Sequence, residues 1–262
     1  MPAGRDGPLD IGDLYVAFIP GDHTPPVEFL LWLTTAYRLS GALSVLDIGC
    51  GTGRLLVPLS DAGWRMTGLE PCEEFLARAR HAVRGSEPAI NLRHGGLLDI
   101  DDQGRFDAMI AISDPFWYLL SATERAEALQ RVYTALKPGG IVVLGGANFV
   151  WILQHYRSPS PSPSPSPSTV RRPGLEITRS PTHEIDPHDA VWIHRDCFTV
   201  SQNGVTTTVR DEHRFAILTP PEVTSALQAA GFGDIQTFSN FESRASERVA
   251  GPHMIFAARR PG

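Results

Sequence analysis

The chain has 262 residues, of which 42% are apolar and 20% charged, a balance typical of a globular protein with one large α/β domain or two small ones. Its net charge is −6 and its Lys and Arg residues are dispersed, which argues against a nucleic-acid partner. No segment reaches the roughly 18 uncharged apolar residues of a membrane span, and the N-terminus lacks a signal-peptide core. We therefore expect a cytoplasmic protein with no membrane partner.

The three cysteines, Cys50, Cys72 and Cys197, are scattered along the chain, which favours a reducing compartment. No cluster of His, Cys and carboxylate residues has the spacing of metal ligands. The sequence therefore predicts no metal site. It leaves the oligomeric state open, a homodimer included.

Short apolar runs alternate with helical patterns over the first 150 residues, which is typical of a parallel sheet covered by helices. The predicted strands are Ser44–Ile48, Arg65–Leu69, Asn91–His94, Ala108–Ile112 and Ile141–Leu144. The predicted helices are Pro26–Leu39, Leu55–Ala62, Glu73–Val83 and Thr123–Leu136. We expect the turn Lys137–Gly140 to end the last helix before the fifth strand.

Residues 158 to 168 read SPSPSPSPSPS, a strict alternation of serine and proline. Proline fixes φ and removes an amide donor, so this segment is predicted to be extended polyproline II or disordered. It is either a docking peptide for a proline-binding domain or a surface loop expanded by repetition.

After this loop, three consecutive β-type runs follow one another, Gly174–Asp186, Ala190–Val200 and Val205–Leu218. The Asn203-Gly204 pair is a strong hairpin signal, so we expect an antiparallel sheet of three strands. Thr219-Pro220-Pro221-Glu222 has the chemistry of a capping box and opens a helix that ends at Gly231. Two final strands, near Ile235–Phe238 and His253–Ala258, return the chain to the main sheet.

A glycine-rich turn, Asp47-Ile-Gly49-Cys50-Gly51-Thr-Gly53, directly follows the first apolar strand. A P-loop would need a Gly-Lys-Ser/Thr ending, which is absent, and a dinucleotide fingerprint would need glycine where Arg54 stands. The bare backbone of the glycines leaves room for a bulky ligand. This order therefore favours a ligand without phosphates.

Two acids narrow the choice of ligand. Asp47 can accept hydrogen bonds from a cationic amine or order the loop through its amides. Glu70 ends the second strand, where an acid can hold two neighbouring ribose hydroxyls. Together they favour a ligand with a ribose and a positive charge but no pyrophosphate, a description that S-adenosylmethionine matches.

The stretch from about Leu46 to Leu144 resembles the class I S-adenosylmethionine-dependent methyltransferases, on its glycine-rich turn, its strand-end Glu70 and its Leu136–Gly140 turn. The resemblance implies a Rossmann-like seven-stranded α/β sheet and S-adenosylmethionine as cofactor. It places adenine beside Gly95–Leu98, where many relatives have an acid at the position of Gly96, so backbone or Asp99 would substitute. The implied cofactor-binding residues are Asp47, Gly49, Cys50, Gly51, Gly53, Glu70, Pro71, Gly96, Leu97 and Ser113.

The acceptor is expected outside the carboxyl ends of the fourth and fifth strands. Asp114-Pro-Phe-Trp117 loosely resembles the motif of amino-methylating nucleic-acid enzymes but lacks its second proline. The wider layout is more similar to bacterial natural-product and amino-sugar methyltransferases, in its N-terminal tyrosine segment and its antiparallel insertion. Those enzymes typically have histidine after the fourth strand, where this chain has Tyr118.

The residues expected to take part in catalysis are Tyr15, Tyr118 and His155. His194 and His213 lie on the predicted insertion, and strict alternation puts His213, Phe215 and Ile217 on one face. Any of these histidines could be a general base, and an exposed, uninvolved histidine is the competing interpretation. The aromatic residues Phe116, Trp117, Phe149, Trp151 and Trp192 either line a partly apolar acceptor site or belong to the core.

The predicted organisation is a cofactor-binding domain of residues 1–157 and 219–262, whose segment 1–40 is an N-terminal lid. A flexible loop of residues 158–173 and a β insertion of residues 174–218 over the substrate site complete it. The hypothesis is methyl transfer to an amine or hydroxyl of a small molecule, with secondary metabolism as the setting. Two alternatives stay open: the same fold and cofactor in a non-methylating reaction, and a non-enzymatic binding or regulatory module.

Overall fold

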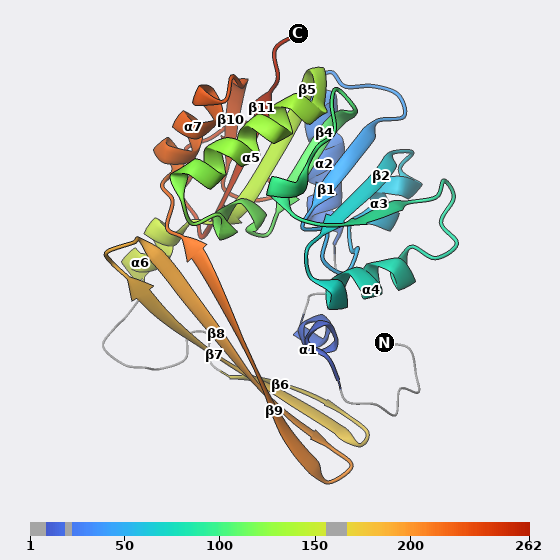
Figure 1. Ribbon diagram of the computed structural model, residues 1–262, viewed down its shortest axis with the longest axis vertical. Helices are drawn as coiled ribbons and strands as arrows, with labels where there is room; N and C mark the ends of the chain where they lie inside the picture. Colours follow the sequence, from blue (N-terminus) through green and yellow to red (C-terminus); the bar gives the residue numbers. More distant parts are fainter. Residues whose placement is uncertain (1–8, 19–22, 156–166) are drawn as a thin grey trace.

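The computed structural model describes residues 9–18, 23–155 and 167–262 (Figure 1). It contains a seven-stranded sheet covered by helices and a separate four-stranded antiparallel sheet that extends away from it. The predicted serine–proline segment lies outside the described residues except for Pro167 and Ser168. Among the described residues, no helix is long and apolar enough to span a bilayer.

The large sheet has the order β10-β11-β5-β4-β1-β2-β3. Neighbouring strands from β5 through β4, β1 and β2 to β3 are parallel, while β11 pairs antiparallel with both β5 and β10. The strand bounds are β1 Ser44–Ile48, β2 Arg65–Glu70, β3 Asn91–His94, β4 Phe106–Ile112, β5 Leu136–Ala147, β10 Gly233–Phe238 and β11 His253–Arg259. The predicted fold class is confirmed.

Helices cover both faces of this sheet, which explains why its strands read as nearly continuous apolar runs. On one face, Leu46 and Met109 pack with α5 (Ala122–Ala135) and α7 (Pro220–Ala229). On the other, Val45 packs with α2 (Thr24–Ala36) and α3 (Leu56–Asp61). Because Phe29, Leu30 and Leu33 of α2 are buried in this second core, α2 belongs to the sheet domain, and the expectation that all of residues 1–40 form a lid is wrong for this helix.

The remaining short elements surround the carboxyl ends of the parallel strands. They are α1 Ile11–Phe18, α4 Glu73–Ala82, η1 Leu97–Asp99, η2 Pro115–Tyr118 and α6 Phe149–His155. Capping boxes begin α5, at Ser121 and Glu124, and α7, at Thr219 and Glu222, and the second is the one that the sequence predicts.

Two local predictions are corrected. Residues 137–140 do not form a turn outside the sheet, because they belong to β5 at an irregularity in its pairing with β4, where the Gly139 amide donates to the Arg260 carbonyl. Ser168–Arg172, expected as flexible loop, forms the strand β6, which pairs antiparallel with Leu175–Arg179 of the next strand. The inserted sheet therefore has four strands, not three.

The inserted sheet has the order β6-β7-β8-β9, with β7 Leu175–Asp186, β8 Val191–Gln202 and β9 Val205–Ala216. Helix α1 packs on it through Leu14, which is fully buried in a small core with Ile177 and Phe198. We call β6–β9 the inserted sheet below. Figure 1 shows α1 between this sheet and α4 of the large domain.

Candidate active site

The glycine-rich turn follows β1 at the carboxyl edge of the sheet. A side chain at Gly49 would meet Pro115 at 2.8 Å, and one at Gly53 would meet Ala79 at 3.3 Å, so these two glycines allow close packing. Gly51 differs, because its φ is +56° and a Cβ there would meet nothing within 4 Å. Only Gly51 of the three presents bare backbone to open space, as a bound ligand requires.

Glu70 ends β2 beside this turn and is 5% exposed. One carboxylate oxygen accepts from the Gly51 amide at 2.8 Å, and the other accepts from the Cys72 amide at 2.9 Å. Burial raises the pKa of Glu70, although these two hydrogen bonds act to lower it. Each oxygen of a carboxylate can accept a second hydrogen bond, so the two amides fix the side chain and leave acceptors for vicinal hydroxyls.

Asp47 lies within β1, one strand away from Glu70, and is 3% exposed. Burial raises its pKa to about 7, while the nearby Arg54 guanidinium acts in the opposite direction. Arg54 also donates to the Ser113 hydroxyl at 2.6 Å, which links the turn after β1 to the loop after β4. A positive charge bound beside Asp47 would lower this pKa and so favour the ionised carboxylate.

Other predicted cofactor residues surround this centre. Asp99 accepts from the Gly96 amide at 2.8 Å and thereby fixes the start of η1, in which Leu97 is buried. The Pro71 carbonyl lies 2.8 Å from Nε2 of His94. The Cys50 side chain packs into the core, so only its backbone is available to a ligand.

The loop after β4 has an unusual backbone, since Ser113 and Asp114 both have left-handed φ values, +69° and +74°. Such values strain residues other than glycine and persist where other contacts enforce them. Here the Asp114 carboxylate accepts from the Ala147 amide at 2.7 Å, which ties the loop to the end of β5. The loop then passes into η2, which ends at Tyr118.

The structure decides the role of most of the aromatic residues. Phe116, Trp117, Phe149 and Trp192 are at most 4% exposed and belong to the core around α5 and α7, while Trp151 is half-buried. The core interpretation therefore holds for these four. Tyr118, at 45% exposure, remains open to a ligand.

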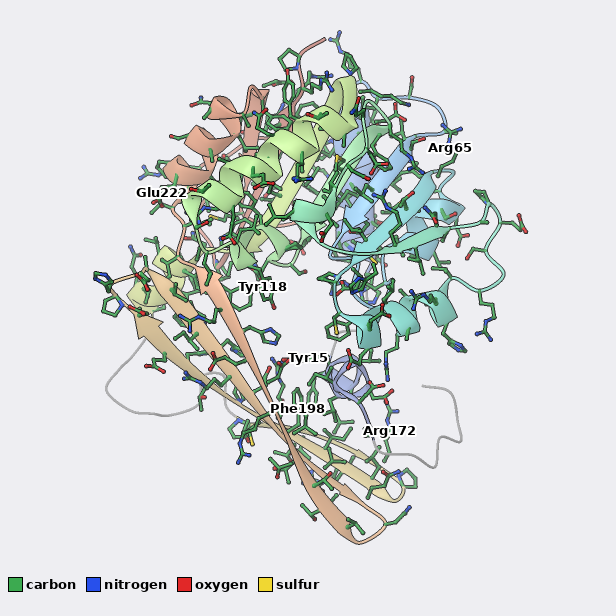
Figure 2. The ribbon with its side chains drawn as sticks, in the orientation of Figure 1. Tyr15, Arg65, Tyr118, Arg172, Phe198 and Glu222 are labelled. Carbon is green, nitrogen blue, oxygen red and sulfur yellow. The ribbon has the colours of Figure 1, made fainter. Side chains whose placement is uncertain are left out.

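Two of the predicted catalytic residues meet at one histidine. His213 of β9 lies with Nε2 2.6 Å from the Tyr15 hydroxyl and Nδ1 2.8 Å from the Tyr118 hydroxyl. Its Nε2 also lies 3.1 Å from Oδ2 of Asp211. Figure 2 shows Tyr118 at the edge of the large domain and Tyr15 on α1, both directed toward the region between that domain and the inserted sheet.

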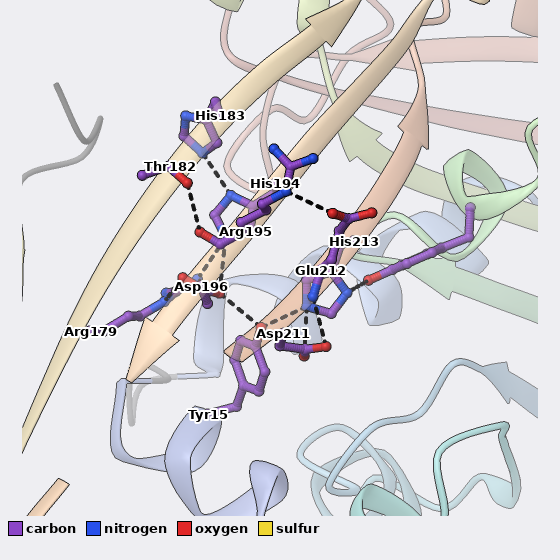
Figure 3. Close-up of polar contacts among 11 residues, drawn as sticks. Tyr15, Arg179, Thr182, His183, His194, Arg195, Asp196, Asp211, Glu212 and His213 are labelled. Carbon is purple, nitrogen blue, oxygen red and sulfur yellow. Dashed lines mark hydrogen bonds and ion pairs between the residues drawn. The ribbon is translucent and has the colours of Figure 1, made fainter. Parts of the chain in front are cut away.

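A second cluster of polar side chains, on the inserted sheet, binds the Tyr15 hydroxyl (Figure 3). Asp196 accepts a bidentate pair from Arg179 at 2.7 and 2.8 Å, and it also accepts from the Tyr15 hydroxyl at 2.8 Å. Burial alone would raise the pKa of Asp196, but hydrogen bonds from His194 and Arg179 hold it well below its usual range. Asp196 is therefore a fixed negative charge that accepts hydrogen bonds.

His155, the third predicted catalytic residue, lies elsewhere. Its exposed ring stacks on Trp151 at 3.8 Å between centroids, and its Nδ1 lies 2.7 Å from the Trp151 carbonyl oxygen. In the described part of the chain it takes no part in the contacts between the two tyrosines. The histidine between the two tyrosines is His213, which the sequence analysis gives only as one candidate base among several. The signal in the sequence is its alternation with Phe215, which puts both side chains on the face of β9 that meets Tyr118.

Comparison with known proteins finds similarity to methyltransferases. Residues 45–140 match the sequence model of the family described as "Methyltransferase domain". The chain is 34% identical to the ubiquinone biosynthesis O-methyltransferase of Bradyrhizobium diazoefficiens over 111 residues, which is 42% of each chain. The chain spans about half the length of the first curated relatives that it matches.

Two similarities extend further along the chain. The dTDP-3-amino-3,6-dideoxy-alpha-D-glucopyranose N,N-dimethyltransferase of Streptomyces fradiae is 28% identical over 190 residues, which is 72% of this chain and 70% of the relative. A solved S-adenosylmethionine-dependent methyltransferase from Clostridium acetobutylicum shares the fold with a TM-score of 0.76, 15% identity and 95% coverage of both chains. Residues 45–140 therefore match a methyltransferase domain, and the chain shares its fold with a solved S-adenosylmethionine-dependent methyltransferase.

Proposed function

We propose that this protein transfers a methyl group from S-adenosylmethionine to an amine or hydroxyl of a small molecule. The acceptor binds between the loop after β4 and the face of the inserted sheet that presents His213. A cytoplasmic role in natural-product metabolism is the setting we propose, supported by the three free cysteines and by the similarity to the Streptomyces enzyme.

The turn after β1 fits S-adenosylmethionine. Glu70, fixed by two amides, would hold the ribose hydroxyls, and bare Gly51 would lie against the nucleoside. Asp47 and Glu70 provide a negative environment for a cation, and Arg54 provides a positive group at the Ser113 loop, where the methionyl carboxylate would bind. When bound, the cofactor supplies an activated methyl group on a sulfonium.

The chain's own contribution to the reaction is mainly to orient the acceptor. Methyl transfer requires the nucleophile in line with the methyl group at near-attack distance, so positioning contributes much of the rate. Tyr15 and Tyr118, joined through His213, present polar groups at the inserted sheet, opposite the turn that would hold the cofactor. The Streptomyces relative acts on an amine and the Bradyrhizobium relative is an O-methyltransferase, so the choice between nitrogen and oxygen stays open.

The observation that carries the proposal is the pairing of Glu70 with the amide of Gly51 across a turn whose glycine faces open space. Isothermal titration tests it. We expect micromolar or tighter binding of S-adenosylmethionine and S-adenosylhomocysteine, and no heat with NAD or ATP. Binding of NAD or ATP in their place would contradict the proposal.

Turnover is tested separately with a panel of defined acceptors. The panel contains dTDP-3-amino-3,6-dideoxy-glucose as the amine and simple phenols and catechols as hydroxyl compounds. S-adenosylhomocysteine and the methylated product are quantified by mass spectrometry. Cofactor binding without methylation of any acceptor class would favour a non-methylating reaction.

A further inference from the structure

Hydrogen-bond counting around Tyr15 assigns the proton on Nε2 of His213. The Tyr15 hydroxyl has one proton and lies 2.8 Å from Asp196, which is ionised and can only accept. Tyr15 therefore donates to Asp196, and its oxygen is left to accept from Nε2 of His213 at 2.6 Å. Asp211, the other neighbour of Nε2, is a carboxylate and also accepts. Nε2 of His213 consequently carries hydrogen.

The second ring nitrogen is left to accept a proton. In the neutral ring, Nδ1 has a lone pair and accepts from the Tyr118 hydroxyl at 2.8 Å. In the charged ring, Nδ1 becomes a donor and the Tyr118 hydroxyl turns its own proton outward. Tyr118 is partly exposed, whereas His213 is largely covered, so a ligand reaches the histidine through the tyrosine.

We propose that His213 accepts the proton released by the methyl acceptor, with the Tyr118 hydroxyl as the relay and Asp211 and Tyr15 as the groups that orient the ring. This inference rests on the proposed function and names the base for it. Asp211, His213 and Tyr118 then form a carboxylate, an imidazole and a hydroxyl in series, in which a third group orients the base. Tyr118 contacts the acceptor, and His213 acts through it as a positioning and proton-accepting residue.

A bond forms between the acceptor nitrogen or oxygen and the methyl carbon, the carbon–sulfur bond breaks, and its electron pair stays on sulfur. The acceptor's proton passes to the Tyr118 oxygen while the Tyr118 proton passes to Nδ1 of His213. The products are the methylated acceptor, S-adenosylhomocysteine and one proton, which the imidazolium later releases to water.

The groups facing His213 come from four elements. Tyr15 belongs to α1, Tyr118 to η2 and Asp211 to β9 itself, while the cross-strand neighbours on β8 are His194, 6.1 Å away between ring centroids, and Asp196, whose charge is paired with Arg179 of β7. The Asp211 carboxylate would stabilise a charged His213, and the bond from His213 is the main reason that the pKa of Asp211 lies below its usual range. His194 offers no equivalent route, because it bonds His183 and Asp196 instead.

Nitrogen NMR of histidine-labelled protein saturated with S-adenosylhomocysteine tests this assignment without an acceptor. At high pH His213 should be the Nε2–H tautomer, and the second proton should enter at Nδ1 when the ring is charged. The Nδ1 signal should move in Tyr118→Phe. An Nδ1–H tautomer at high pH, a ring still doubly protonated there, or an Nδ1 signal unmoved by Tyr118→Phe would overturn the proposal.

Kinetics with any acceptor methylated in the panel provide a second readout. His213→Gln keeps a donor for Tyr15 but has no titratable nitrogen, so kcat should fall about 100-fold or more. The loss of rate toward low pH should disappear with it. His188→Gln, at an exposed position in the turn between β7 and β8, is the control and should keep that pH profile, whereas an unchanged profile in His213→Gln would refute the base assignment.

These outcomes are distinguishable from failure of the proposed function. Titration calorimetry of His213→Gln should give the same affinity for S-adenosylmethionine as the unmodified protein. If neither protein binds the cofactor, the proposed function fails; if both bind it and the NMR signals show the other tautomer, only the base assignment fails.

Discussion

The Glu70 carboxylate accepts a hydrogen bond from the Gly51 amide at 2.8 Å, which joins the acid at the tip of β2 to the turn after β1. The same side chain also accepts from Cys72. Its position is thus set by backbone groups on both sides before any ligand binds.

Replacing Glu70 by glutamine should weaken S-adenosylmethionine binding at least tenfold. A neutral amide loses the charge-assisted bonds to the ribose hydroxyls, each worth about 1.5–3 kcal/mol. Titration calorimetry measures the change. Glu127→Gln, on the exposed surface of α5 where Glu127 pairs with Arg131, is the control and should bind normally. Equal affinities in both variants would remove Glu70 from the site.

Alanine at Gly51 should reduce cofactor affinity more than it reduces stability. The left-handed φ of +56° costs an alanine about 1 kcal/mol, and the new methyl group would occupy the open space beside the turn. Gly104 provides a matched control, since its φ is +53° and a Cβ there also meets nothing within 4 Å, but it lies before β4 at the opposite edge.

Urea unfolding should therefore show similar losses for Gly51→Ala and Gly104→Ala. Calorimetry should show a tenfold or greater loss of cofactor affinity for Gly51→Ala alone. Similar affinities in the two variants would mean that Gly51 is required only for the shape of the turn.

The raised pKa of Asp47, about 7, predicts a pH-dependent stability. The folded chain holds this proton more tightly than the unfolded chain, whose aspartate pKa is about 3.9. The contribution of Asp47 to the unfolding free energy should therefore fall as pH rises from about 4 to about 7, by at most about 1.4 kcal/mol per pH unit.

Urea unfolding of the ligand-free protein at about pH 5 and pH 7.5 checks this sign. Asp47→Asn should gain stability relative to the unmodified protein as the pH rises. Asp101→Asn, at an exposed position in the loop before β4, should show no such change. A relative stability of Asp47→Asn that stays constant with pH would contradict the raised pKa.

Arg78 should hold α1 in place. Its guanidinium lies 2.6 Å from Asp10 and 2.5 Å from Asp13, and its side chain is 17% exposed. Arg78→Met leaves two acids without their cation, so hydrogen exchange over residues 11–18 should become faster. Arg80→Met is the control, because Arg80 lies on α4, the helix that also carries Arg78, but is exposed and pairs with Glu73. Equal exchange in the two variants would show that the inserted sheet alone holds α1.

The large sheet could be predicted from the sequence because each of its strands is an apolar run that alternates with helical patterns. Local signals were sufficient there: Thr219 and Glu222 predicted the start of α7, and Asn203-Gly204 the turn between β8 and β9. The sequence does not predict β6 because four of its five residues, all but Val170, are polar and exposed, and the strand is recognised by its pairing with β7.

The placement of Asp47, Gly51 and Glu70 together at one edge of the sheet could also be anticipated, since they lie on one short stretch with a recognisable order. The polar cluster could not. Tyr15 meets a partner 181 residues away in Asp196 and another 198 residues away in His213. No local pattern specifies such a contact, because the packing of α1 against the inserted sheet creates it.

The placement of β6–β9 between β5 and α7 has a consequence for how this protein can change. Every strand of the inserted sheet comes from one uninterrupted stretch, whereas Gly51 and Glu70 lie on an earlier one. Under the proposed function, the part of the acceptor site that the inserted sheet forms can therefore vary within residues 168–216 alone, and a graft of this stretch from a relative should change acceptor selectivity while Gly51 and Glu70 stay in place.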